Sequence, residues 1–160
     1  MTIKVGDSVP NGSFKHMTAE GMEELSTGEL FGGKKVVLFS LPGAFTPTCS
    51  AKHLPGFVQH AGDLKGKGVD TIACMSVNDA FVMDAWGKDQ SVGDSVVMLA
   101  DGNAEFAKSL GLDFDASGFG MGTRAQRFAM IVDDGKVTTL NVEEPGAFEV
   151  SSAEAMLAAL

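Results

Sequence analysis

The residues around Cys49 have the types and spacing to carry nucleophilic chemistry. Cys49 follows Thr46 by three residues, and both come shortly after an apolar stretch, residues 35–41. If the stretch leads into a helix, Cys49 lies in the first turn of that helix. The sulfur is then near unpaired backbone N–H groups and the positive end of the helix dipole. This position favours the thiolate, which is the nucleophilic form of cysteine.

Thr46 and two prolines complete the candidate site. The Thr46 hydroxyl can accept a hydrogen bond from the thiol or donate one to an oxygen lying over the sulfur. Pro42 and Pro47 restrict backbone motion on either side of it. The spacing Thr46-x-x-Cys49 is that of a dithiol motif whose first cysteine has been replaced, so Cys49 cannot form a local disulfide and stays available to a small oxidant. A thiol transferase or disulfide reductase, which needs a second local cysteine, is disfavoured.

The elements that must position these residues alternate between strands and helices. Buried strands are predicted at residues 35–41, 69–77 and 96–100, and hairpins at residues 14–27 and 128–141, the second turning at Asp134-Gly135. Helices are predicted at residues 47–64, 79–88, 103–110 and 153–160, with a helical turn at residues 28–31. The pattern predicts one α/β domain over residues 1–160 with a mixed sheet flanked by helices.

Local signals refine two of the helices. Pro55-Gly56 lies inside the helix predicted at residues 47–64, where it is expected to kink the helix or divide it in two. Asn78 precedes the next helix, and its side chain is expected to cap that helix by accepting a free backbone N–H.

Composition excludes several classes of function. The net charge of −9 and the pI near 4.6 disfavour a nucleic-acid partner, which would require a basic patch. No apolar run approaches the ~20 residues that span a bilayer, and the N-terminal residues lack the pattern of a targeting leader, so we expect a cytoplasmic protein that does not enter membranes. The two cysteines and three histidines lack the spacing of a metal site.

The fuller motif resembles a known family. The pattern Pro42-x-x-x-Thr46-x-x-Cys49 matches the signature of peroxiredoxins, and residues 41–50 together with residues 53–57 look like the peroxiredoxin 5, or type II, subfamily. Residues 76–83 and 124–128 also match this subfamily. The resemblance covers nearly the whole chain.

The resemblance implies a fold, a reaction and a set of roles. The fold would be thioredoxin-like, and the reaction would be reduction of hydrogen peroxide and organic hydroperoxides without metal, haem or flavin. Cys49 would be the peroxidatic cysteine, Thr46 a hydrogen-bonding partner of the peroxide, Pro42 a shield of the pocket, and Arg127 the cation beside the sulfur. A guanidinium at the start of the strand predicted at residues 128–132 could hold a thiolate in fixed geometry without itself titrating.

The second cysteine bears on how the oxidised enzyme is reduced. Some family members carry a resolving cysteine before the last helix, but residues 144–152 contain none. Cys74 lies in a predicted strand, where a cysteine behaves as a small buried hydrophobe with a raised pKa. The resemblance therefore suggests an external thiol reductant, either glutathione with glutaredoxin or thioredoxin.

Several interpretations stay open from the sequence. A redox sensor or binding module that is oxidised at Cys49 is the alternative to a turning-over peroxidase. His53 is interpreted as a structural or surface residue, because a thiolate paired with arginine needs no base, and Arg124 is expected to be solvated. By analogy with the subfamily's homodimer, an interface would use some of four aromatic residues, with core packing as the alternative for each: Phe45, Phe81, Trp86 and Phe119.

Overall fold

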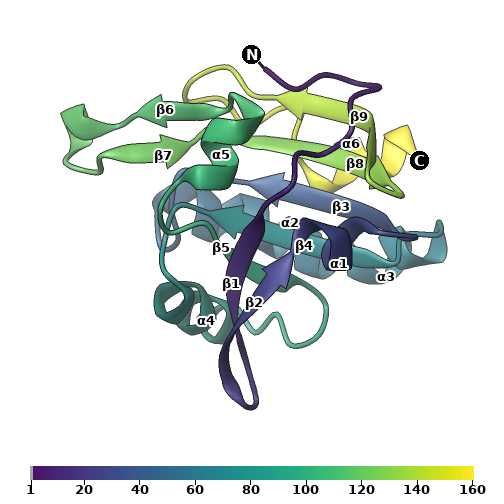
Figure 1. The fold of residues 1–160 in the computed structure, drawn as a ribbon, viewed down its shortest axis with the longest axis horizontal. Coiled ribbons are helices and arrows are strands. Elements are labelled where there is room, and N and C mark those ends of the chain that lie inside the picture. The colour runs from purple at the N-terminus through teal and green to yellow at the C-terminus, as the bar shows by residue number, and fades with distance from the viewer. Residues whose placement is uncertain (1) are drawn as a thin grey trace.

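The computed structural model, which describes residues 2–160, is built on a seven-stranded mixed sheet with the order β2-β1-β5-β4-β3-β8-β9 (Figure 1). The strands of this sheet are β1 (Ser13–Thr18), β2 (Gly21–Ser26), β3 (Lys35–Ser40), β4 (Thr71–Ser76), β5 (Val97–Ala100), β8 (Phe128–Asp133) and β9 (Lys136–Val142). The helices are α1 (Thr27–Phe31), α2 (Leu54–Gln59), α3 (Ala61–Gly66), α4 (Ala80–Asp89), α5 (Glu105–Leu110) and α6 (Ala153–Ala159). The predicted α/β class with a mixed sheet is confirmed.

β3 is an interior strand, and its pairing sets the position of the site. It runs parallel to β4 and antiparallel to β8, and Ser40 at its carboxyl end pairs with Phe128 at the amino end of β8. The segment that leaves β3 and the segment that enters β8 therefore meet at one edge of the sheet. The Ser40 hydroxyl joins them directly by donating to the Gln126 carbonyl at 3.0 Å.

Alternate residues of β3 point into two apolar layers, as expected for a strand covered on both faces. Val37 and Phe39 pack into the layer beneath α2, α3, α4 and α6, which also contains Cys49. Val36 and Leu38 pack into the layer on the other face, against α1 and α5. In Figure 1, α1 and α5 lie in front of the sheet, while α2 and α3 lie behind it.

The helix predicted at residues 47–64 is present but is divided differently from the expectation. The chain is helical from Pro47, widens into a π-helical turn at Cys49–His53, continues as α2 and breaks at His60 before α3. Pro55 is tolerated because it stands in the first turn of α2, directly after the widened turn, where its missing N–H costs little. The helix is thus divided in two, one of the two predicted outcomes, but the division falls at His60 and not at Pro55-Gly56.

The start of α4 is a second correction. Asp79, not Asn78, caps the helix by accepting from the Val82 N–H at 2.8 Å. The Asn78 amide oxygen instead accepts from the Ala44 N–H at 3.0 Å and from the Ser76 hydroxyl at 2.6 Å. Asn78 thus ties the end of β4 to the segment that follows β3.

Other predicted ends of elements are confirmed. Gly111 ends α5 in the left-handed conformation, with φ at 72°, which a residue without a Cβ adopts freely. The β8–β9 hairpin turns at Asp134-Gly135, where φ is positive at both residues. The sequence patterns did not predict the short ribbon of β6 (Asp113–Asp115) and β7 (Thr123–Ala125), which projects at the upper left of Figure 1.

No helix within residues 2–160 is both long enough and apolar enough to cross a membrane.

Candidate active site

The turn after β3 is held in a tight, closed shape. The Thr46 hydroxyl donates to the Gly43 carbonyl at 2.7 Å, which closes the turn from inside. Gly43 leaves room for two neighbouring side chains, because a Cβ there would lie 2.9 Å from Arg124 Nη1 and 3.1 Å from Thr46 Cγ2, and both would have to shift. Phe45 has a φ of 64°, a conformation that is uncommon for a bulky residue, and its side chain is 54% exposed.

Cys49 lies in the first helical turn beyond this segment, as predicted, and is fully buried. Its carbonyl accepts from the Leu54 N–H, five residues later, which is the bond of a π-helical turn. The neighbouring Ser50 hydroxyl accepts from the indole N–H of Trp86 at 3.0 Å, so α4 braces the turn from outside.

Arg127 reaches the sulfur from the start of β8. Its Nη2 donates to Cys49 Sγ at 3.1 Å, and its Nη1 donates to His53 Nδ1 at 2.8 Å. No carboxylate among residues 2–160 forms an ion pair with Arg127. A full positive charge therefore faces the sulfur without a neutralising partner.

His53 is buried between these groups and the end of the chain. Its Nε2 lies 2.9 Å from the Ser151 carbonyl, and its ring packs against Phe39, Phe57 and Phe148, with centroids 4.9 to 5.7 Å away. Burial, reinforced by the Arg127 charge, lowers the pKa of His53 to about 3. The imidazole is accordingly neutral near pH 7.

A buried carboxylate, Glu143, organises the segment that holds His53. Its oxygens accept from the backbone N–H groups of residues 149–151 at 2.8 to 3.0 Å and from the Ser151 hydroxyl at 2.6 Å. Burial acts to raise the pKa of Glu143, but the Ser151 hydroxyl and these N–H groups outweigh it and hold the pKa below its usual value.

Cys74, the second cysteine, is buried in β4 beside Phe39 of β3. Burial, and next the proximity of Cys49, raise the pKa of the Cys74 thiol well above its usual value. The predicted structural environment of Cys74 is therefore confirmed.

Arg124 is placed differently from the expectation that it is solvated. It is half-buried, donating from Nε to the Met121 carbonyl at 3.0 Å and from Nη1 to the Pro42 carbonyl at 3.2 Å. Arg124 lies before the strand predicted at residues 128–132, as expected, but it belongs to β7, which the sequence patterns did not predict and which brings its side chain to the turn after β3.

The structure thus brings the four predicted site residues to one edge of the sheet. Cys49 and Arg127 are in direct contact, and Pro42 and Thr46 lie in the closed turn, where the Thr46 hydroxyl bonds to Gly43. Sequence reasoning missed the contact of His53 with Arg127 and the role of Glu143, because both arise from long-range packing with no local motif.

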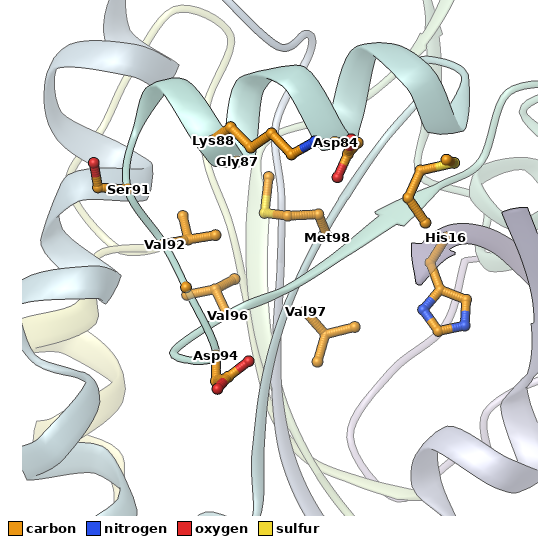
Figure 2. Close-up of a pocket in the computed structure, with 12 residues that line it drawn as sticks. His16, Asp84, Gly87, Lys88, Ser91, Val92, Asp94, Val96, Val97 and Met98 are labelled. Atoms are coloured by element: carbon orange, nitrogen blue, oxygen red, sulfur yellow. Dashed lines mark ion pairs between the residues drawn. The ribbon is translucent and has the colours of Figure 1, made fainter. Parts of the chain in front are cut away.

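A separate hollow lies away from these residues, between β1, α4 and β5 (Figure 2). Its volume is about 450 Å³, and its rim carries an ion pair between Asp84 and Lys88 at 3.0 Å. None of the four predicted site residues lines it. Within residues 2–160, no group of three or more His, Cys, Asp or Glu side chains is arranged to hold a metal ion.

Comparison with known proteins gives the class that this fold and site define. The Redoxin family model matches residues 4–157, so the chain belongs to that family. Peroxiredoxin-2B of Arabidopsis thaliana is 51% identical over 99% of this chain and 98% of its own length.

Solved structures narrow the assignment. The crystal structure of reduced Prx3 in complex with H2O2 from Vibrio vulnificus superposes with a TM-score of 0.96 at 57% identity, covering 99% of each chain. The Plasmodium falciparum antioxidant protein, a 1-Cys peroxiredoxin, superposes with a TM-score of 0.89 at 31% identity, covering 96% of each chain. The protein is a peroxiredoxin of thioredoxin-like fold, and it is a thiol-dependent peroxidase.

Proposed function

We propose that this peroxiredoxin reduces hydrogen peroxide and small organic hydroperoxides at Cys49, with Arg127, Thr46 and Pro42 as the other site residues. The observation that carries the proposal is the 3.1 Å contact between Arg127 Nη2 and Cys49 Sγ. A permanent cation at that distance stabilises the thiolate and can also face the charge that develops on the peroxide. The Vibrio vulnificus relative, described with bound H2O2, supports the choice of substrate.

The reaction balances without a prosthetic group. The Cys49 thiolate attacks one peroxide oxygen, the O–O bond breaks, and the other oxygen leaves as water or an alcohol after taking up a proton. Cys49 is thereby oxidised to a sulfenic acid. Thr46 would bond to the bound peroxide, and Pro42 would shield the sulfur from bulk water.

Regeneration requires two external thiols. The first displaces water from the sulfenic acid to form a mixed disulfide with Cys49, and the second releases the Cys49 thiol and leaves as the disulfide. Glutathione with glutaredoxin, or thioredoxin, would supply these thiols. Because Cys49 is fully buried, the reductant can reach it only when the first helical turn opens.

Substitution of Cys49 by serine tests the assignment. Cys49→Ser is expected to abolish peroxide consumption in the presence of excess thiol, whereas Cys74→Ser, which changes the buried β4 cysteine, is expected to retain it. Peroxide loss should be followed with each reductant system in turn. Full turnover by Cys49→Ser would refute the site, and a single oxidation of the wild type followed by a stall would favour a redox sensor.

A further inference from the structure

We propose that His53 is a positioning residue for this reaction, a neutral ring that fixes the Arg127 guanidinium against the Cys49 sulfur and is itself fixed by the segment that Glu143 organises. The proposal deepens the function proposed above and rests on it. It concerns a histidine and a glutamate that make no direct contact with the reacting sulfur in the hydrogen bonds of residues 2–160.

The first step of the argument is the arginine fork. One terminal nitrogen of Arg127 donates to the sulfur and the other donates to His53 Nδ1, at 3.1 and 2.8 Å. A single hydrogen bond leaves a long arginine side chain free to turn about that bond. Two bonds from the planar guanidinium fix both its position and its plane. The bond to the histidine is therefore what sets the plane in which the other nitrogen meets the sulfur.

The second step is the tautomer of His53, which its partners determine. The guanidinium has only donors, so Nδ1 must be an acceptor, and the Ser151 carbonyl has only an acceptor, so Nε2 must carry the proton. The ring is therefore neutral, and the one lone pair that could accept a proton is already engaged. Its role is to hold Arg127, not to take the proton of Cys49.

The third step is the charge balance. The His53 ring is a neutral acceptor, so it bonds to the guanidinium without placing a negative charge beside the thiolate. The nearby anion, Glu143, acts one step further away, where it fixes residues 149–151 and so sets the Ser151 carbonyl that receives Nε2–H.

The test compares two substitutions of the ring. His53→Phe keeps an aromatic ring among Phe39, Phe57 and Phe148 but removes the acceptor, whereas His53→Gln restores one acceptor and one donor. His60→Phe, seven residues further along the same helical segment, is the matched control, because the hydrogen bonds of the His60 ring within residues 2–160 go to the exposed carboxylates of Asp63 and Glu154 and not to Arg127. Circular dichroism and thermal melting establish that each variant is folded.

The positive charge beside the sulfur is the quantity that distinguishes a positioning role from a merely structural one, because a structural role would leave it unchanged. Cys49 is alkylated with iodoacetate, an anion, and with iodoacetamide, which is neutral, and the ratio of the two rate constants reports the nearby cation. His53→Phe is expected to lower this ratio and to slow the reaction with peroxide by about tenfold to a hundredfold, since small displacements of a positioning group have effects of this size. His53→Gln and His60→Phe are expected to stay near the wild type.

Each result decides the question. A folded His53→Phe variant with an unchanged alkylation ratio and an unchanged peroxide rate would overturn the proposal, as would a His53→Gln variant that loses as much as His53→Phe. If His53→Phe does not fold, His53→Leu, which also removes the acceptor for Arg127 Nη1, replaces it in the same comparison with His53→Gln. Because alkylation needs no peroxidase turnover, a failure of the proposed function would not be mistaken for a failure of this one.

Glu143 is tested separately with its exposed neighbour as the control. Glu143→Gln removes the buried charge that receives the N–H groups of residues 149–151, and Glu144→Gln removes an exposed charge next to it. The first is expected to lower the alkylation ratio and the peroxide rate severalfold, and the second to change neither. Equal behaviour of the two variants would overturn the role of Glu143.

Discussion

The reactivity proposed for Cys49 depends on the positive charge of Arg127. No carboxylate within residues 2–160 forms an ion pair with that charge. Arg127 meets the sulfur from one side and a neutral imidazole from the other. An ammonium group in this position would be a compact charge that could not serve both partners in a fixed plane. The identity of this residue, and not only its charge, should therefore matter for the rate.

Substitution of Arg127 by lysine tests that requirement. Arg127→Lys keeps the charge but loses the fork, and the second-order rate constant for peroxide is expected to fall about a hundredfold, the size of effect seen when one donor to a developing oxyanion is lost. The rate constant should be measured under limiting peroxide with excess reductant. A variant with the rate of the wild type would show that charge alone suffices.

His53 also makes stability depend on pH. The ordinary pKa of 6.5 falls to about 3 in the folded protein, mainly through burial and then through Arg127, so the unfolded chain binds the proton more readily. The stabilisation from the neutral ring is complete above pH 6.5 and is lost as the pH falls from there towards 3. The free energy of unfolding is expected to decline by up to about 1.4 kcal/mol per pH unit in that window.

Chemical denaturation at a series of pH values, compared with His53→Gln, isolates this contribution. The variant lacks the titrating ring, so its stability should depend less steeply on pH between 6.5 and about 4.5. Below that, Glu143 and other carboxylates contribute in both proteins, because a lowered carboxyl pKa also costs stability in acid. Identical slopes for the two proteins would contradict the assignment.

At the scale of the elements, the ribbon of β6 and β7 clamps the turn after β3. Arg124 carries this clamp through its bond to the Pro42 carbonyl and its packing on Gly43. Replacing Arg124 by leucine is expected to cost about 1.5 to 3 kcal/mol of stability, the usual size for a hydrogen bond from a charged group, and to slow the reaction with peroxide. Denaturation and peroxide kinetics measure the two effects, and a variant with neither would show that the ribbon does not constrain the turn.

The elements also show what a sequence pattern can and cannot predict. The strand at residues 35–41 and the helix carrying Cys49 were predictable because their periodicity is local. The division of that helix was not, since the π-helical turn places Pro55 where it costs little and moves the break to His60. The β6–β7 ribbon has strands of three residues, which are too short to show an alternating pattern.

The candidate site, too, was predictable where a local motif exists and not where contacts are long-range. The motif predicted Pro42, Thr46, Cys49 and Arg127, and the antiparallel pairing of β3 with β8 explains why Arg127 meets Cys49 across 78 residues. Glu143 and the contact of His53 with Arg127 could not be predicted, because each depends on how the segment before α6 folds back over the helix. Asn78 was predicted to cap α4 but instead bonds to the turn after β3. The two roles call for the same residue type, so the sequence does not distinguish them.

At the scale of the whole molecule, three phenylalanine side chains within residues 2–160 are exposed to solvent. Phe45, Phe81 and Phe119 are 54%, 64% and 83% exposed, whereas Trp86 is buried in the core. Exposed rings of this size are costly on a surface that stays in water. They support the proposal of a homodimer in which the three phenylalanines, but not Trp86, contribute to the interface.

The oligomeric state and one substitution test the dimer. Sedimentation equilibrium is expected to find a dimer, and Phe119→Asp is expected to raise its dissociation constant at least about tenfold, as loss of a central aromatic anchor does. Val5→Asp, at another exposed apolar residue with 57% exposure, is the control and should leave the association unchanged. A monomeric wild type would refute the interface.

The bond from Trp86 to Ser50 gives the molecule a built-in optical signal. This is the chain's single tryptophan, it is shielded from solvent, and its indole N–H ends on the residue next to Cys49. We expect that adding an oxygen to the sulfur, or unwinding its turn, disturbs that bond and changes the emission of the indole. Unlabelled protein mixed with peroxide in a stopped-flow fluorimeter should therefore report each oxidation and each recovery as they happen.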